Sequence, residues 1–456
     1  IDNGTTTTVS GTASLASPAP GVTLYVQIFS NLTCEHSPYG EGRTLLGTVT
    51  GVTDGAGVAT FSGTFPSGLL GQVVTATTNT LLTAGGNTSE FSACMTVSRT
   101  LWARQFGSTA DDWAEGISAE ASGVYVAGFT MGALPGQTSS GGRDALVRKV
   151  DHAGNELWTR QFGTAGDDAS RGISVDASGV YVAGYTDGTL PGQASSGTRD
   201  AFVRKYDLGG SELWTRQFGS VNSDIALAIS ADAGTAYVVG VADGDAFLRK
   251  YDAAGNEVWA RQFGSTGGNI ATRVALDASG VYVAGYTGGT LPGQTSSGGI
   301  DVIVRKYDPN GTELWTHQFG SAADDMGWGI ACDSSGVYVS GWTKGSLPGQ
   351  TSSGGMDVFV RKYDLSGTEL WTRQLGTASD DSGGGISADA SGVYVYGYTG
   401  GTLPGQIRIG SWDAFVRAYG SAGNEIWTYQ FGTAGSEWTG SIAAYGSALY
   451  VSGEVL

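Results

Sequence analysis

The sequence predicts an all-β protein in which a seven-bladed β-propeller follows a small N-terminal β-sandwich. Three observations lead to this prediction: a phrase repeated seven times, alternating strand patterns inside each repeat, and a change of composition near residue 98. The phrase reads LWARQFG in its first copy, and its copies begin at residues 101, 157, 213, 258, 314, 370 and 426. Internal repeats of this order of length are typical of propellers and solenoids.

Each repeat contains four strand patterns and no helix pattern. In the second repeat, alternating β-branched, aromatic and other apolar residues occupy residues 172–176, 180–186, 201–207 and 212–218. The connections carry turn residues, with Asp176 before Gly179 and Asp207 before Gly210. Such short connections predict hairpins, so the four strands of a repeat form an antiparallel meander.

The fourth strand of each repeat carries large apolar groups on both faces. Trp214 and Phe218 lie on one side of this strand, and Leu213 lies on the other. A sheet that is apolar on both faces must pack between two other sheets, and repeats of this length achieve that by radial packing as blades. The tryptophans of the repeated phrase are therefore predicted to lie between blades.

Residues 1–98 form a separate predicted domain, and residues 99–456 form the propeller. The first domain is rich in Thr, Ser and Val, and its strand patterns occupy residues 22–30, 44–52, 57–65, 72–78 and 92–98. Five or six short strands in about a hundred residues predict a β-sandwich.

The last blade is incomplete in this sequence. Residues 101–107 predict an isolated fourth strand ahead of the first full blade, and six complete blades follow up to Gly432. Two further strand patterns occupy residues 440–445 and 448–454, and no third-strand pattern follows them. Either the natural chain continues beyond residue 456, or another chain supplies the strand by strand addition.

These motifs resemble known bacterial repeats. The propeller repeat resembles the SBBP-type β-propeller repeat through residues 200–214 (DAFVRKYDLGGSELW), the pair Asp167 and Asp168, and residues 176–186 (DASGVYVAGYT). Residues 1–98 resemble Ig-like or transthyretin-like modules of bacterial surface proteins through residues 39–47 and 87–92. The resemblance implies a propeller fold, an extracellular or envelope location, and a spacer or assembly role for the first domain. It implies no single activity.

Charge and cysteine content favour a secreted or cell-surface protein. The chain has 24 Lys and Arg against 42 Asp and Glu, a net charge of -18, which disfavours nucleic acid and anionic membranes as partners. No apolar run approaches the roughly 20 residues of a membrane span. Cys34 and Cys94 both lie in the first domain, and a disulfide between them would suit an oxidising compartment. The alternative is two buried thiols, and Cys332 is expected to be a buried free thiol.

A pair of carboxylates recurs in the loop between the fourth strand of one blade and the first strand of the next. Its copies are Asp111, Asp112, Asp167, Asp168, Asp324, Asp325, Asp380 and Asp381. The preferred interpretation is that they accept backbone N–H bonds in a tight inter-blade loop and pair with Arg160 or Arg204 and their equivalents. Calcium ligation is the alternative. We therefore expect no cofactor, with Ca²⁺ as the one candidate. Aspartates that open the third strand, such as Asp144 and Asp200, are predicted to accept hydrogen bonds there.

Five tryptophans outside the repeated pattern support a carbohydrate-binding hypothesis, because they suit exposed platforms for sugar rings: Trp113, Trp328, Trp342, Trp412 and Trp438. Of these, Trp328, Trp342 and Trp412 are the candidate ligand-binding residues. One face also carries long loops containing LPGQ, and blade three shortens its loop to residues 242–245, which leaves a notch.

An enzyme is the remote alternative. Residues 207–214 resemble the tryptophan-docking repeats of quinoprotein dehydrogenases, although the basic residue that follows their glycine is absent. The three histidines occupy different structural positions and the repeats are nearly interchangeable, which disfavours a catalytic constellation.

The sequence thus predicts a non-catalytic secreted or cell-surface protein with a structural or adhesive role. Self-assembly through a strand donated to the incomplete last blade is part of this prediction. Expected partners are other surface proteins, further copies of the chain, or glycans.

Overall fold

The computed structural model describes residues 103–446 and 448–455, together with Asp54 and six strands of the N-terminal part. The chain divides into two compact units, one consisting mainly of Ile1–Ala103 and the other mainly of Arg104–Tyr445. The sequence analysis placed this boundary at residue 98. Among the described residues there is no helix with the length and apolar character that crossing a membrane requires.

The first unit contains two antiparallel sheets, β1-β4 and β3-β2-β5-β6. Its strands are β1 (Thr6–Ser14), β2 (Thr23–Asn31), β3 (Thr44–Val52), β4 (Val58–Pro66), β5 (Val73–Asn79) and β6 (Met95–Thr96). The five predicted strand patterns correspond to β2–β6. The sequence analysis gave no range for β1, because its Thr and Ser residues provide little contrast between an apolar and a polar face. Cys34 and Cys94 lie outside the described residues, so their disulfide stays a prediction.

The second unit contains six complete four-stranded antiparallel blades, which confirms the predicted meander of four strands per repeat. The first strands are β7 (Asp112–Glu120), β11 (Asp168–Asp176), β15 (Ile225–Asp232), β19 (Asn269–Asp277), β23 (Asp325–Asp333) and β27 (Asp381–Asp389). The second strands are β8 (Gly123–Thr130), β12 (Gly179–Thr186), β16 (Thr235–Ala242), β20 (Gly280–Thr287), β24 (Gly336–Thr343) and β28 (Gly392–Thr399). The third strands are β9 (Asp144–Val150), β13 (Asp200–Tyr206), β17 (Asp245–Tyr251), β21 (Asp301–Tyr307), β25 (Asp357–Tyr363) and β29 (Asp413–Tyr419). The fourth strands are β10 (Glu156–Phe162), β14 (Glu212–Phe218), β18 (Glu257–Phe263), β22 (Glu313–Phe319), β26 (Glu369–Leu375) and β30 (Glu425–Phe431).

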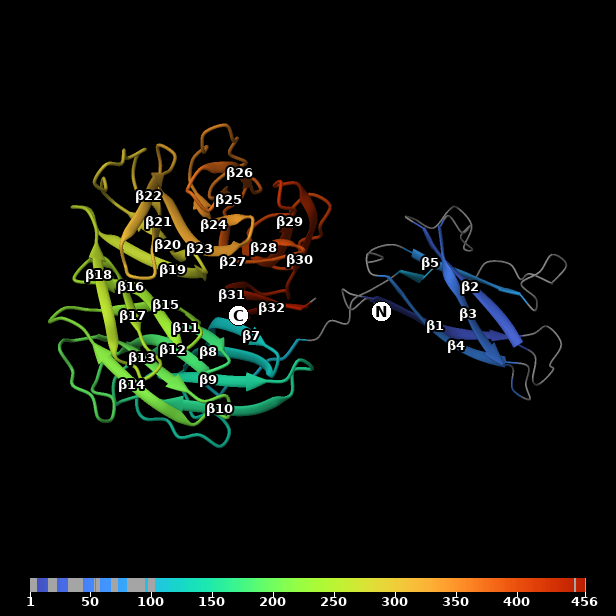
Figure 1. The fold of residues 1–456 in the computed structure, drawn as a ribbon, viewed down its shortest axis with the longest axis horizontal. Coiled ribbons are helices and arrows are strands. Elements are labelled where there is room, and N and C mark those ends of the chain that lie inside the picture. Colours follow the sequence, from blue (N-terminus) through green and yellow to red (C-terminus); the bar gives the residue numbers. More distant parts are fainter. Residues whose placement is uncertain are drawn as a thin grey trace. The chain divides into compact units, whose positions relative to one another are not determined.

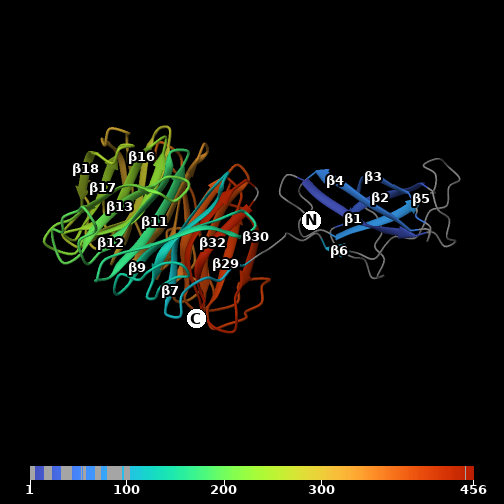
Figure 2. The ribbon, with the colours of Figure 1, turned by 90° about the horizontal axis from the view of Figure 1, so that it is seen from below.

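A seventh blade completes the ring with two strands, β31 (Glu437–Tyr445) and β32 (Ala448–Val455). The first strands of neighbouring blades contact one another all the way round, and β31 lies between β27 and β7 (Figure 1). The structure therefore confirms a seven-bladed propeller with a short seventh blade among the described residues. Seen from the side, the strands of the blades run through the thickness of the ring (Figure 2).

Apolar side chains fill the space between neighbouring blades. Between blades one and two, Tyr125 and Val147 of the first blade pack with Val180, Val182 and Phe202 of the second. All five are at most 1% exposed. Since each blade face is covered by the next blade, the inner strands of a sheet are apolar on both faces. The prediction that Leu213 lies on a packed second face of the fourth strand is wrong, because Leu213 is 53% exposed near the end of the outermost strand.

The short loop of blade three is a two-residue hairpin. Asp243 and Gly244 join β16 to β17 with φ angles of 53° and 81°. Positive φ at both central residues is the geometry of a type I′ turn, for which Asp-Gly is a preferred sequence. The other five complete blades carry the long LPGQ loop between the same two strands.

Candidate functional site

In the five complete blades that have a long loop, the glutamine of the repeated phrase binds the fourth strand to that loop. In blade one, Gln161 Nε2 donates to Asp144 Oδ2 at 2.8 Å and to the Gly132 carbonyl at 2.9 Å. Its Oε1 accepts the Leu134 N–H at 2.9 Å. The fourth strand thus holds the first residue of the third strand, and Asp144 accepts hydrogen bonds there as predicted.

The tryptophan and arginine of the phrase reach across to the next blade. Trp158 Nε1 donates to the Leu208 carbonyl at 3.2 Å, and Arg160 Nε donates to the Gly210 carbonyl at 2.7 Å. Gly210 has a φ of 84°, and a Cβ there would lie 2.8 Å from Trp158 Cδ2. These contacts confirm that the repeat tryptophans pack between blades.

The phenylalanine of the phrase supports an arginine of the next blade. The guanidinium of Arg204 lies 3.9 Å from the centre of the Phe162 ring. Arg204 also forms an ion pair with Glu212 at 3.2 Å. The prediction that Arg160 and Arg204 pair with the repeated loop aspartates is wrong, because these arginines are engaged by backbone carbonyls and by Glu212.

Residues 103–107, the described part of the first copy, keep the same contacts with blade one. Arg104 donates to the Ala153 carbonyl at 3.4 Å, as Arg216 does to the Ala254 carbonyl at 3.1 Å. The Phe106 ring lies 4.1 Å below the Arg148 guanidinium. Towards blade one, residues 103–107 therefore occupy the place of a fourth strand.

The prediction that this copy forms a β-strand is nevertheless wrong for its described residues. Residues 103–107 have no regular secondary structure. A β-strand is defined by hydrogen bonds to a neighbouring strand, and the third strand that would lie beside this segment is absent from the described part of blade seven. The side-chain contacts persist without the backbone pairing.

An unfilled position, here called the blade-seven slot, lies between β32 and residues 103–107. Val451 of β32 is 36% exposed, whereas Val182 at the equivalent position of blade two is fully buried. Gln105 is exposed, although its counterpart Gln161 is half-buried against its loop. Side chains that elsewhere contact the third strand are thus accessible here.

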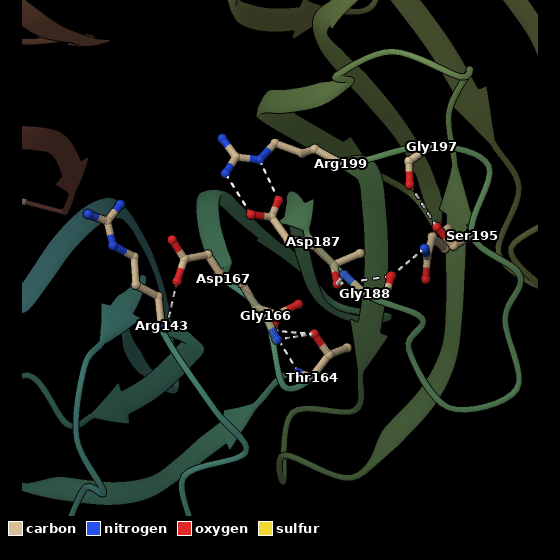
Figure 3. A network of polar contacts seen from close by, with 12 residues as sticks. Arg143, Thr164, Gly166, Asp167, Asp187, Gly188, Ser195, Gly197 and Arg199 are labelled. Atoms are coloured by element: carbon tan, nitrogen blue, oxygen red, sulfur yellow. Dashed lines mark hydrogen bonds and ion pairs between the residues drawn. The ribbon is translucent and has the colours of Figure 1, made fainter.

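The loop aspartate beside this slot, Asp111, is likewise more accessible than a partnered counterpart would be. Asp167 Oδ1 accepts the backbone N–H of Arg143, the residue before the third strand of blade one, at 3.1 Å (Figure 3). Asp111 is the counterpart of Asp167 next to blade seven, and it is exposed. Its expected donor belongs to the position where the third strand of blade seven would begin.

His152 links blade one to blade seven by contacts that the sequence analysis did not anticipate. His152 Nδ1 lies 2.8 Å from the Tyr450 hydroxyl, and its ring stacks on Tyr445 at 5.5 Å. Other repeats carry Leu, Ala, Pro or Ser at this turn position. A single aromatic substitution in a turn was the only available signal.

The second aspartate of each repeated pair begins the first strand of a blade. Asp168 accepts the Thr164 N–H at 2.6 Å, and its equivalents make the same bond. The equivalents are Asp112, Asp325 and Asp381. Burial raises the pKa of Asp168, Asp325 and Asp381, against the effect of these hydrogen bonds.

The first aspartate of each pair lies in the loop. Asp324 and Asp380 accept backbone N–H bonds from Ile300 and Met356 at 3.3 and 2.8 Å, like Asp167. The preferred interpretation of the pairs as backbone acceptors is therefore confirmed for these residues. Nearby, Arg199 binds Asp187 through two bonds of 2.6 and 2.9 Å (Figure 3).

Few of the described residues are candidates for a metal-ion site or a reactive thiol. No group of three or more His, Cys, Asp or Glu side chains able to hold a metal ion occurs within the described part of the chain. Calcium ligation stays an untested alternative. Cys332 is a free thiol whose Sγ donates to the Leu276 carbonyl at 3.1 Å, and burial raises its pKa to about 12.

The three predicted sugar-binding tryptophans do not form one site. The ring centres of Trp328 and Tyr286 are 6.0 Å apart. The Lys344 ammonium lies 5.6 Å from the centre of the Trp342 ring. Trp412 stacks on Trp438 at 6.0 Å, and Tyr398 lies edge-on to both rings. All three predicted tryptophans are half-buried against neighbouring side chains.

Comparison with known proteins supports the fold of the repeat. Residues 157–191 match the SBBP β-propeller repeat family. The regulatory protein FlaEY of Caulobacter vibrioides is 31% identical over 178 residues, which are 35% of this chain and 19% of that relative. The chain therefore spans about a fifth of the length of the curated relative that it matches.

Solved structures resemble the chain only distantly. A Bacteroides fragilis protein proposed to be a 6-phosphogluconolactonase is 11% identical, with a TM-score of 0.42 and coverage of 90% of this chain and 95% of that chain. A variant of the Synechocystis apocarotenoid oxygenase is 10% identical, with a TM-score of 0.39 and coverage of 94% and 93%. Similarity at this level carries no argument about activity.

Proposed function

We propose that this protein is a non-catalytic structural or adhesive protein of the cell exterior whose blade-seven slot takes up an additional β-strand. The proposal includes an Ig-like spacer role for residues 1–98. The repeat resemblance and the net charge of -18 support an exterior location.

One observation carries the strand-uptake proposal. Residues 103–107 hold the fourth-strand contacts with blade one while the neighbouring third-strand position is unfilled. A sheet edge with backbone groups and apolar side chains exposed is a template for strand addition. Val451 supplies an accessible apolar contact at this edge.

The complete blades define the chemistry of the strand that fits. Their third strands begin with Asp, continue with apolar residues and carry Arg at the fifth position, as Asp200 and Arg204 do. In the slot, the Asp would accept from Gln105, as Asp200 does from Gln217 at 2.7 Å. The Arg would lie over Phe431 of blade six, as Arg204 lies over Phe162.

A synthetic peptide with the sequence of residues 198–207 tests this proposal directly. Fluorescence anisotropy of the labelled peptide should show saturable binding with one site per chain, and a scrambled peptide should not bind. Gln105→Ala should weaken binding about tenfold because it removes a hydrogen bond to a charged group. The matched control Gln262→Ala changes the equivalent residue of complete blade three. Equal binding of both peptides would refute the proposal.

Self-assembly is a separate part of the proposal and needs a separate measurement. Sedimentation analysis of the purified chain at rising concentration should show species larger than the monomer. If the chain were strictly monomeric and still bound the peptide, the self-assembly proposal would be wrong and the strand-uptake proposal would stand.

Carbohydrate binding is the second candidate function, and the aromatic cluster of Trp412, Trp438 and Tyr398 favours it. Aromatic faces stack on the apolar faces of sugar rings. A glycan array probed with the parent chain and with Trp328→Ala, Trp342→Ala and Trp412→Ala should show ligands lost in one variant. If the parent chain bound no glycan on the array, the carbohydrate-binding hypothesis would be wrong.

A further inference from the structure

A cavity of about 130 Å³ lies at the axis of the propeller, lined by the first strands of all seven blades. It is here called the axial cavity. Its volume is well above what one water molecule needs. Neither the repeated loops nor the blade-seven slot contributes to its lining.

Three charged side chains line the axial cavity. Glu115 comes from β7, Arg171 from β11 and Arg273 from β19. Arg171 forms an ion pair with Glu115. A smaller cavity of about 40 Å³ shares Glu115 and adds the carboxyl of Glu454.

Arg273 departs from the repeat pattern at a position that is otherwise small. Equivalent residues in blades one, two, five and six are glycines, Gly116, Gly172, Gly329 and Gly385. A Cβ at Gly172 would lie 2.8 Å from Ala228 Cα, which shows how closely neighbouring strands approach there. Blade four therefore places a long cationic side chain where four other blades place none.

Arg273 adds a charge that the lining of the axial cavity does not balance. Its NH1 group donates to the Thr272 carbonyl at 2.9 Å. Burial lowers the pKa of Arg273; Glu115 opposes this effect and the neighbouring Arg171 charge adds to it. The residues that line this cavity carry two guanidinium groups and one carboxylate, so the lining itself has one positive charge in excess; Glu454 lies outside this lining, in the smaller cavity beside Glu115. Arg273 is half-buried, and a partly buried charge without a direct counter-ion is costly.

Aliphatic side chains line one level of the axial cavity, beside a wall that is otherwise mostly polar. Ile173 and Ile229 belong to a row of branched side chains at one level of the first strands. The other members that line the cavity are Ile117, Val274, Ile330 and Ile386. A ligand with one negative charge and a short apolar part would match both the arginines and this row.

We propose that the axial cavity binds a small aliphatic monocarboxylate, with its carboxylate on Arg273 and Arg171 and its carbon chain against the isoleucines. A planar carboxylate matches the fork of a guanidinium and forms two parallel hydrogen bonds with it. Its single charge equals the excess charge of the lining. Phosphate carries more charge at neutral pH and has no apolar part, so it fits less well.

Calorimetric titration of the full chain with sodium butyrate, acetate, phosphate and chloride at constant ionic strength tests the proposal. Butyrate should bind saturably at one site and more tightly than acetate or phosphate. Arg273→Gln should weaken butyrate binding at least about tenfold. Arg408→Gln is the matched control, because Arg408 is an exposed loop residue that donates to the Gly410 and Ser411 carbonyls, and it should bind butyrate like the parent.

Folding of the variants can be checked independently. Arg273→Gly introduces the residue of four other blades and should retain the far-ultraviolet circular dichroism of the parent while losing butyrate binding. If butyrate does not bind the parent, if phosphate binds more tightly, or if the folded Arg273 variants bind like the parent, the proposal is wrong.

Discussion

Blade two and blade seven share a repeat and differ in how much of it they complete. Blade two has four strands, β11–β14, and its Val182 is fully buried. Blade seven has β31 and β32, and the equivalent Val451 is 36% exposed. Both blades nevertheless place a first strand in the ring and contact both neighbours.

This difference shows that the strands of a blade have two separate structural roles. Closing the ring requires the first strand, because the first strands contact one another around the axis. Burying the outer apolar surface requires the third and fourth strands, because they complete the sheet that covers the next blade. Blade seven closes the ring with its first strand. Covering the outer surface is left to residues 103–107, which keep the contacts between Phe106 and Arg148 and between Arg104 and Ala153.

The largest expected effect contrasts the two valines. Val182→Ala should lower the free energy of unfolding by about 2 kcal/mol, because it removes two fully buried carbon groups and leaves a cavity. Val451→Ala should cost less than about 1 kcal/mol, because its side chain is already partly in water. Urea unfolding followed by tryptophan fluorescence measures both. Equal losses would mean that blade seven is as well covered as blade two.

The second prediction compares Asp168, which begins the first strand of blade two, with Asp112, which lies next to blade seven. A Cβ at Gly163 would lie 2.5 Å from Asp144 Oδ1 and 2.8 Å from Asp168 Oδ2, so the two carboxyls are close. At the next-but-one junction the pair is Asp245 and Asn269, whose Nδ2 donates to Asp245 Oδ1 at 2.9 Å. Asp168→Asn should therefore stabilise the protein by about 1 kcal/mol at neutral pH.

The pH dependence of this effect follows from the raised pKa of Asp168, which burial and then the Asp144 charge cause against its hydrogen bonds. A raised pKa means that the protonated form stabilises the fold. That contribution is complete below the ordinary value of 3.8 and is lost as the pH rises through the folded-state pKa. The gain from Asp168→Asn should thus shrink as the pH falls through the folded-state pKa and be smallest below pH 3.8. Asp112→Asn is the control and should change stability little, because blade seven has no described third-strand aspartate.

The smallest expected effect concerns the stacking of arginine on phenylalanine. Phe106→Leu should cost about 0.5 to 1 kcal/mol, since it removes a cation–π contact at a partly exposed site and the sixth copy of the phrase carries Leu375 there. Phe162→Leu should cost more, because Phe162 also packs edge-on against Phe202 at 5.5 Å. If Phe106→Leu had no measurable effect in the same urea titration, residues 103–107 would not be packed as a fourth strand.

Much of the propeller could be predicted from sequence because its rules are local. Alternation over seven or eight residues predicts each strand, and Asp176 with Gly179 or Asp207 with Gly210 predicts each turn. The roles of Asp144 and Asp168 were also predictable, since a carboxylate before a strand has backbone N–H groups within reach. The recurrence of these residues in several repeats supported each local interpretation.

The site residues were less predictable because their contacts join distant segments. Arg273 and Glu115 are far apart in sequence, and only the ring brings them to one cavity. His152 meets Tyr450 across almost the whole length of the propeller. No spacing rule relates such pairs, because the ring closes by packing and not by chain connectivity.

By itself, the sequence determined the number of blades, the strands within each blade and the residues that join them, because periodicity and turn chemistry act over short distances. Only the tertiary structure decided that residues 103–107 pack as a fourth strand without forming one, and that Val451 and Gln105 are exposed beside the unfilled third-strand position. The physical reason is that strand formation depends on a hydrogen-bonded neighbour, and the neighbour of that segment is set by the closed ring.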